Sequence, residues 1–274
     1  MLIYNGLDIE NYKYDEIKGN IDTNYYIRNK YGQIKLILIE IEFITRIKKK
    51  NIEFKNFYVC GAAPGIHYYL LSQMYPEIQF ILYDKRKFYD KLYKQKNVTI
   101  NKYYCTQDVI KTFNNGVFVS DLRSLEIEDN KLNNKKNIIY CRDMYEQLFL
   151  YKLTNCCACL LKFKVPEQLI SFPYIKGELL IQPFINSNEL RLISITDDIE
   201  FKYYNGDELD KKCQLINNYW KNQDEIKCNN EIINKIIKEK KFHMKWDTIA
   251  MLDIIIRADK LNFLDNILFL IQKK

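Results

Sequence analysis

The segment Phe57-Tyr58-Val59-Cys60-Gly61-Ala62-Ala63-Pro64-Gly65 (57–65) joins a short apolar run to a loop that contains two glycines. The residues that follow, Ile66–Met74, lack glycine and proline and predict a helix, with Pro76 just beyond its end. A second apolar run, Ile78–Tyr83, predicts another strand, which ends at Asp84. This order of strand, loop, helix and strand predicts a parallel βαβ unit.

The same alternation extends along the chain in both directions. Further expected elements are strands at Val98–Tyr104, Val117–Ser120, Cys159–Val165, Leu179–Phe184 and Leu190–Thr196, and helices at Gln33–Lys48 and Ile138–Leu153. The last two strands are separated by Asn186-Ser187-Asn188, which predicts a hairpin. Helix-like stretches fill the chain from Asp224 onward. We therefore predict a Rossmann-like α/β fold, with a mostly parallel sheet, a closing antiparallel hairpin and helices on both faces.

Composition limits the class of protein. The chain has 274 residues, 47% of them hydrophobic, which suits one large domain over 31–274 preceded by a polar arm over 1–30. Its formal net charge of +7 fits a nucleic-acid partner, although each basic cluster could also be a solvated face. No secretory signal or membrane span is visible, so we expect a cytoplasmic protein with reduced cysteines. With two histidines and no paired Cys-x-x-Cys motifs, we expect no metal.

The loop after the first strand is a candidate nucleotide site. Gly61 and Gly65 allow close approach of the backbone to a ligand. Asp84 lies 23 positions after Gly61, near the offset at which an acid accepts ribose hydroxyls in nucleotide-binding βαβ units. The loop lacks the G-x-G-x-x-G pattern, which argues against a nicotinamide dinucleotide. A tight strand-to-helix turn is the ordinary alternative for these residues.

Two lysines and two acids stand in unusual surroundings. Lys35 lies in the apolar stretch QIKLILIEIEF, and Lys162 interrupts the expected strand CLLKFKV. Asp121 follows one expected strand and Glu189 precedes another. Buried lysine can act as a base when its surroundings lower its pKa, and carboxylates can orient it. Taken singly, a snorkelling lysine or a strand-end carboxylate would explain each residue equally well.

The order Lys35, Asp121, Lys162, Glu189 resembles the catalytic tetrad of RNA 2′-O-methyltransferases. Short islands resemble the poxvirus cap-specific mRNA 2′-O-methyltransferase family, whose members also serve as the regulatory subunit of poly(A) polymerase. The islands are Gly32–Leu36, Cys60–His67, Val119–Ser124, Leu161–Phe163, Gln182–Phe184, Glu189–Ser194, Phe242–Met244 and Ile267–Leu270. They follow one order across nearly the whole chain.

The resemblance implies an S-adenosylmethionine (SAM)-dependent methyltransferase fold and a role for each matching residue. Lys162 matches the general base, and Lys35, Asp121 and Glu189 match its supporting residues. Positions that match the SAM pocket are Gln33, Gly61, Ala63, Pro64, Gly65, Asp84, Arg86, Tyr104, Cys105 and Asp121. Asp84 would hold the ribose hydroxyls, and the backbone near Tyr104 and Cys105 would flank the adenine.

The resemblance also implies a site for the 7-methylguanosine cap, built from two stacking aromatic rings and two acids. Glu167 and Asp210 match the acids, and Tyr25 or Tyr26 could be one ring. The family's second ring, after Pro166, is deleted here, so Glu167 follows directly. Phe163 or Phe172 could replace that ring, which is a hypothesis that this sequence leaves open.

The function that we expect is methylation of the ribose 2′-oxygen of the first transcribed nucleotide of capped mRNA. Capped mRNA and a poly(A) polymerase catalytic subunit are the expected partners, in the cytoplasm and, for a viral protein, in viral factories or the virion. Two alternatives stay open: a methyltransferase acting on uncapped RNA, and a polymerase accessory subunit that binds RNA without catalysis. Retention of all four tetrad residues favours catalysis.

Overall fold

A central mixed β-sheet organises the chain. The computed structural model describes residues 2–3, 6–9, 32–122, 133–166, 171–184, 188–196, 198–218, 221, 223 and 226–272. Within these residues, seven strands form one sheet in the order β4-β3-β2-β5-β6-β9-β8. Their bounds are β2 Asn56–Cys60, β3 Gln79–Tyr83, β4 Val98–Asn101, β5 Gly116–Ser120, β6 Ala158–Lys164, β8 Glu178–Leu180 and β9 Glu189–Ile195. The first five strands in that order run parallel, and β9 pairs antiparallel with both β6 and β8.

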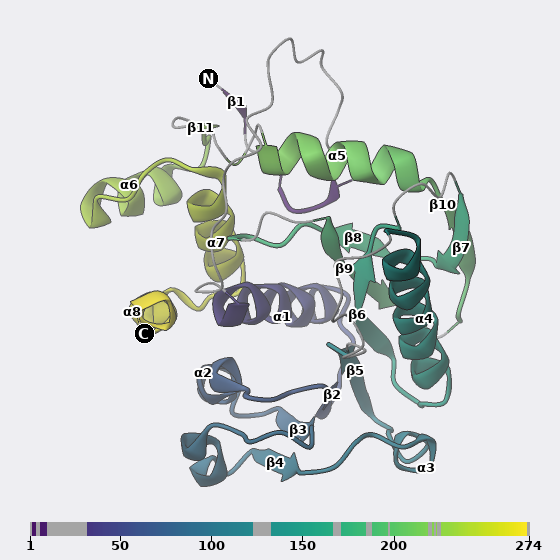
Figure 1. Ribbon diagram of the computed structural model, residues 1–274. Helices are drawn as coiled ribbons and strands as arrows, with labels where there is room; N and C mark the ends of the chain where they lie inside the picture. The colour runs from purple at the N-terminus through teal and green to yellow at the C-terminus, as the bar shows by residue number, and fades with distance from the viewer. Residues whose placement is uncertain are drawn as a thin grey trace.

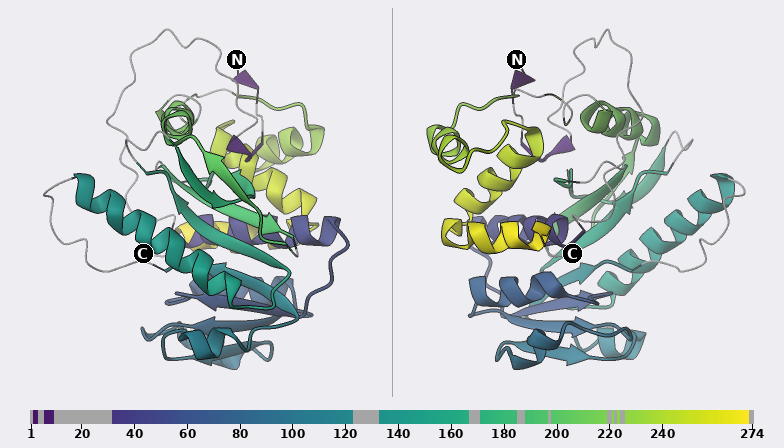
Figure 2. Two further views of the ribbon diagram at one scale, coloured as in Figure 1. Left: turned by 90° about the vertical axis from the view of Figure 1, so that its right-hand side faces the viewer. Right: turned by 60° about the vertical axis from the view of Figure 1, so that its left-hand side comes forward.

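Helices cover both faces of the sheet. The long helices α1 (Gly32–Lys49) and α4 (Asn133–Lys152) lie on opposite sides (Figure 1). Figure 2 shows α7 (Trp246–Arg257) and α8 (Leu264–Gln272) beside α1, away from α4. Further elements are α2 Ile66–Met74, η2 Asp90–Lys94, α3 Gln107–Ile110, α5 Gly206–Asn218, α6 Glu231–Lys240 and η4 Leu261–Phe263. The predicted α/β class, mostly parallel sheet and closing antiparallel hairpin are therefore confirmed.

Burial explains why the apolar runs form central strands. All five residues of β5 are buried, as are four of the five in β2, because helices lie on both faces of these strands. α1 is almost as enclosed, with twelve buried residues, so its β-branched side chains pack into the core. No helix in the described part of the chain is long and apolar enough to cross a membrane.

Two predicted strand ends are wrong. The strand expected at Leu179–Phe184 ends at Leu180, because the chain then turns toward other partners. The N–H of Ile181 donates to the carbonyl of Leu7, and Phe184 has a φ of 63° with its N–H donating to Asp247. The strand expected at Val98–Tyr104 ends at Asn101, and the exposed rings of Tyr103 and Tyr104 follow it. Residues 185–187, where the hairpin turn was expected, lie outside the described residues.

A second, smaller sheet and the N-terminal segment complete the fold. β7 (Phe172–Ile175) pairs antiparallel with β10 (Phe201–Tyr204), and neither strand was predicted. β1 (Leu2–Ile3) pairs in parallel with β11 (Ile226–Lys227), so the start of the chain joins its C-terminal part. Leu7 and Ile9 are buried. The described pieces of the expected arm therefore pack against the domain, and the boundary at residue 30 stays a prediction.

Candidate active site

The loop after β2 folds across the ends of β3 and β5. Gly61 has a φ of 85°, and a Cβ there would lie 3.0 Å from the backbone carbonyl of Asp121. Only glycine satisfies both the dihedral angle and this close approach. The backbone N–H of Ala63 donates to Oδ2 of Asp84 over 3.1 Å. The loop thereby brings the carboxyl ends of three neighbouring strands into contact, as expected for a ligand site in such a sheet.

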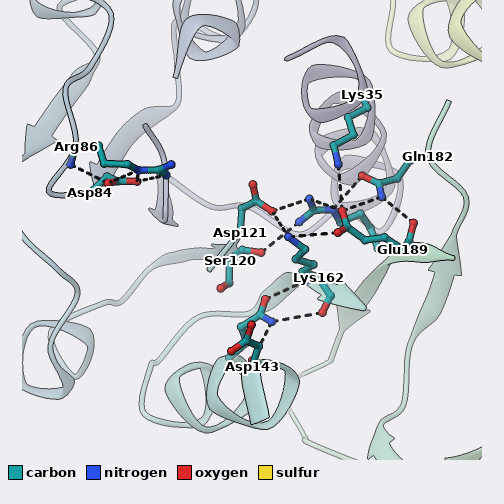
Figure 3. Close-up of polar contacts among 11 residues, drawn as sticks. Lys35, Asp84, Arg86, Ser120, Asp121, Asp143, Lys162, Gln182 and Glu189 are labelled. Carbon is teal, nitrogen blue, oxygen red and sulfur yellow. Dashed lines mark hydrogen bonds and ion pairs between the residues drawn. The ribbon is translucent and has the colours of Figure 1, made fainter. Parts of the chain in front are cut away.

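Asp84 is held in one orientation at the end of β3. Its Oδ1 accepts the backbone N–H of Arg86 at 2.9 Å, and its Oδ2 accepts Nη2 of Arg86 at 2.7 Å (Figure 3). Burial raises the pKa of Asp84. The hydrogen bonds from Arg86 and Ala63 lower it by a larger amount, so the pKa of this carboxyl lies below its ordinary value. The side chain is therefore an ionised, oriented acceptor.

A cavity of about 380 Å³ opens beside this loop. Eight of the ten residues predicted for the cofactor line it: Gln33, Gly61, Ala63, Asp84, Arg86, Tyr104, Cys105 and Asp121. The other two, Pro64 and Gly65, do not line it. Gly65, at a φ of 67°, precedes α2, and the carbonyl of Pro64 accepts the N–H of Tyr89. These two residues therefore contribute to the conformation of the loop and do not face the cavity.

The two predicted lysines and two predicted acids come together next to this cavity (Figure 3). Nζ of Lys162 lies 3.4 Å from Oδ1 of Asp121 and 3.3 Å from Oε2 of Glu189. Nζ of Lys35 donates to Oε1 of Glu189 over 3.1 Å. The four side chains come from α1, the end of β5, β6 and the start of β9, so only the folded sheet brings them into contact.

Arg191 is a fifth charged member of this cluster, and the sequence reading did not single it out. It is 1% exposed, and its Nη2 donates to Oδ1 of Asp121 over 2.8 Å. Nε of Arg191 donates to Gln182, whose Nε2 donates to the backbone carbonyl of Glu189. A signal was present in the sequence, because Glu189 and Arg191 alternate with leucines and must share one face of a strand.

The charges in the cluster are unequal, with three cations around two carboxylates. Burial raises the pKa of Asp121, but Arg191 and Lys162 lower it by more, so it lies well below its ordinary value. Burial lowers the pKa of Arg191, but Asp121 and Glu189 raise it by more. Asp121 and Arg191 therefore stay charged at neutral pH. The other two cations are lysines, and a lysine side chain, unlike that of arginine, can serve as a general base in proteins.

The predicted cap-binding residues are only partly described. Glu167 and Tyr25, as well as Tyr26, lie outside the described residues. Asp210 lies on α5, where its carboxylate accepts Asn188 at 3.4 Å and Gln214 at 2.7 Å. Phe163 and Phe172 do not supply a stacking ring for the cap, because both side chains are buried. Both rings are buried in the core, 5.8 Å apart, and each packs against Tyr204.

The family of the chain follows from a comparison of its sequence with family models. Residues 1–265 match the model described as poly(A) polymerase regulatory subunit. The chain belongs to this family. The predicted family is therefore confirmed. No curated protein matches this regulatory-subunit homologue significantly in sequence.

One solved structure supports the fold, and a second is reported beside it. Bluetongue virus VP4, described as a multifunctional RNA-capping production line, is 15% identical in sequence and aligns with a TM-score of 0.50. The alignment covers 74% of this regulatory-subunit homologue and 33% of VP4, so the chain spans about a third of that protein's length. A Plasmodium falciparum protein described as a ribosomal RNA methyltransferase is 13% identical over 63% of this chain and 98% of its own, with a TM-score of 0.37.

Proposed function

We propose that the protein transfers the methyl group of SAM to the ribose 2′-oxygen of the first transcribed nucleotide of capped mRNA. The observation that carries this proposal is the contact of Lys162 with Asp121 and Glu189 beside the cavity. A ribose hydroxyl is a poor nucleophile, and transfer to it needs a positioned proton acceptor. Lys162 is the proposed general base.

The lining of the cavity suits the adenosine end of SAM. Asp84 offers carboxylate oxygens to the two ribose hydroxyls, in an orientation fixed by Ala63 and Arg86. Tyr104 and Cys105 line the same cavity and are proposed to flank the adenine. Gly61 and Ala62 also line the cavity, and the small size of these two residues leaves room for a ligand. This lining fits SAM better than a dinucleotide, whose pyrophosphate would need more donors.

Charge balance supports a lysine as the base. SAM supplies an electrophilic methyl group on sulfur. With SAM bound, Nζ of Lys162 would accept the proton of the 2′-hydroxyl, so that the products of transfer would be a 2′-methyl ether and S-adenosylhomocysteine. Asp121 and Glu189 face Nζ and would stabilise the ammonium that forms. Arg191 shares both acids, which keeps them from stabilising the ammonium too strongly before reaction.

Stimulation of a poly(A) polymerase is a second candidate function. The family description favours it, because a regulatory subunit implies a catalytic partner. The basic excess of the chain fits RNA as a shared ligand of both functions. Recognition of the cap by Glu167, Asp210 and an N-terminal tyrosine is the finer part of the proposal. A pull-down with the polymerase catalytic subunit, followed by a poly(A)-extension assay, tests the second function.

The methyltransferase function is tested with methyl-labelled SAM and two short RNAs of one sequence. One RNA carries a 7-methylguanosine cap, and the other ends in a 5′-triphosphate. Label only on the 2′-oxygen of the first nucleotide of capped RNA supports the proposal, and loss of that label in Lys162→Ala assigns it to this site. Label on both RNAs keeps the chemistry and removes the cap requirement. Label on neither RNA removes the catalytic proposal and favours the polymerase-accessory function.

A further inference from the structure

The backbone of Lys162 is hydrogen-bonded to a side chain on α4. β6 extends beyond the end of its parallel neighbour, because Ser120, the last residue of β5, pairs with Leu161, and Lys162 follows. Figure 3 shows this part of the Lys162 backbone turned toward the helix that carries Asp143. The N–H of Lys162 donates to Oε1 of Gln147 over 3.1 Å, and Nε2 of Gln147 donates to the carbonyl of Lys162 over 3.5 Å. One amide therefore contacts both backbone polar groups of the proposed base.

The orientation of the Gln147 amide follows from its partners. A backbone N–H can only donate, so the atom that faces the nitrogen of Lys162 is the amide oxygen. Nε2 also donates to the carbonyl of Asp143, one turn earlier on α4, over 3.0 Å. Gln147 is 1% exposed, at a core-facing position where a helix ordinarily carries an apolar residue. Because a buried amide needs partners, the backbone of Lys162 accounts for a glutamine here.

The turn of α4 that carries Gln147 is itself anchored to the second sheet. The hydroxyl of Tyr174, on β7, donates to the carbonyl of Met144 over 2.8 Å. The hydroxyl of Tyr145 donates to the carbonyl of Pro173, also on β7, over 2.6 Å. Tyr174 and Met144 are both buried, so this attachment is part of the core. The helix therefore presents Gln147 to β6 from a fixed position.

We infer that Gln147 is a positioning residue for the proposed general base and acts through the backbone of Lys162. The inference rests on the proposed function. Nζ of Lys162 lies 3.4 Å from Oδ1 of Asp121 and 3.3 Å from Oε2 of Glu189, so the two carboxylates hold one end of this long side chain. Gln147 holds the other end, at the backbone. Proton transfer requires the base to lie within hydrogen-bond reach of the ribose hydroxyl, so a shift of the Lys162 backbone should slow transfer without weakening ligand binding.

The first test separates the rate of transfer from binding. Gln147→Met keeps a similar side-chain volume but removes both hydrogen bonds to Lys162. Gln147→Glu keeps an acceptor for the N–H of Lys162, and burial favours its neutral form, whose O–H can donate to the carbonyl. Gln73→Met, at an exposed position of α2, is the matched control. Methyl transfer to capped RNA gives kcat and KM, and calorimetry gives the dissociation constant for S-adenosylhomocysteine.

We expect Gln147→Met to lower kcat roughly 10- to 100-fold, the effect of misplacing a reacting group by about 1 Å. Gln147→Glu should lower kcat less, because it can rebuild both hydrogen bonds. The KM for capped RNA and the dissociation constant for S-adenosylhomocysteine should change by less than about threefold in both variants, since the loss lies in the transition state. Gln73→Met should transfer the methyl group at the wild-type rate.

The second test uses the protein without SAM or RNA. Hydrogen exchange of the Lys162 amide, followed by NMR, should become roughly 10-fold faster or more in Gln147→Met and stay at the wild-type rate in Gln73→Met, because Gln147 accepts from that N–H. A wild-type kcat in Gln147→Met would overturn the positioning role, whatever the exchange rate. Equal losses of kcat in Gln147→Met and Gln147→Glu, with weaker binding of S-adenosylhomocysteine, would also overturn it, because they indicate general damage to the fold. Wild type that transfers no methyl group, with faster exchange in Gln147→Met, would overturn the proposed function and leave only the backbone contact.

Discussion

Nη2 of Arg191 donates to Oδ1 of Asp121 over 2.8 Å, and the same oxygen lies 3.4 Å from Nζ of Lys162. Arg191 thus competes with Lys162 for one carboxylate. Its guanidinium also reaches Gln182 and the carbonyl of Ser120, which fixes the side chain in the sheet. The arrangement makes Arg191 a positioning residue for the proposed base.

Arg191→Lys should slow methyl transfer, because an ammonium cannot reproduce the planar fork that contacts Asp121, Gln182 and Ser120. We expect kcat to fall roughly 10- to 100-fold, the effect of losing one or two charge-assisted hydrogen bonds. Single-turnover rates at saturating SAM and capped RNA measure the change. A kcat equal to that of wild type would mean that charge alone suffices at this position.

Lys162→Ala should remove the proposed base and leave ligand binding intact. We expect the transfer rate to fall roughly 100- to 10,000-fold, the usual contribution of a positioned base. The dissociation constant for S-adenosylhomocysteine should change by less than about threefold, because the loss lies in the transition state. Lys176→Ala is the control, since Lys176 pairs with Glu200 on an exposed surface. Strong residual transfer in Lys162→Ala would move the base to another group, with Lys35 the first to test.

Asp84→Asn should weaken the binding of S-adenosylhomocysteine by roughly 10-fold or more, because the proposed role of the Asp84 carboxylate is to accept hydrogen bonds from both ribose hydroxyls. The pKa of Asp84 lies below its ordinary value, so the carboxylate is ionised throughout pH 5 to 8. Its contribution to affinity should therefore be constant over that range. Calorimetry at several pH values measures this. A loss of affinity between pH 5 and 6 that is absent from Asp84→Asn would contradict the assignment.

Asp121→Asn should lower the free energy of unfolding at pH 7 and make the protein less sensitive to acid. The pKa of Asp121 is held well below its unfolded value of about 3.9. Its stabilisation is complete above that unfolded value and is lost as the pH falls through the lower folded value. The stability difference between wild type and variant should therefore shrink below about pH 4. Urea unfolding at pH 7, 4 and 3 measures it, and a difference that does not depend on pH would refute the prediction.

Lys221→Met should destabilise the fold near the catalytic cluster. The buried Nζ of Lys221 donates to the carbonyl of Gln182 over 2.8 Å and lies 3.7 Å from Asp247. Methionine fills a similar volume but leaves that carbonyl without its donor, at a cost of about 1–3 kcal/mol. Urea unfolding at pH 7 measures the free energy of unfolding of Lys221→Met and of the control Lys235→Met. The side chain of Lys235 is 75% exposed, so its substitution should leave that free energy unchanged. Equal stability of both variants would show that Lys221 is dispensable.

Local signals predicted the elements whose partners are close in the sequence. The helix at Ile66–Met74 matches α2 at both ends, because a glycine loop and a proline bound it. Within the described residues, the missed strands β7 and β10 pair with one another, and their paired residues lie at least 26 positions apart (Ile175 and Phe201), so neither strand shows its partner locally. Helix α5 was missed although Leu209, Cys213 and Ile216 recur at helical spacing and are buried. That signal was present in the sequence.

The sequence by itself determined the α/β class, the glycine loop with its acid at Asp84, and the four residues Lys35, Asp121, Lys162 and Glu189. Apolar periodicity and loop chemistry are local, so they can be read from residue order. Tertiary structure alone decided that Arg191 joins the four, and that the backbone N–H of His67 donates to Oε1 of Gln33. These contacts join residues up to 70 positions apart, and they depend on strand register and helix orientation, which residue order does not reveal.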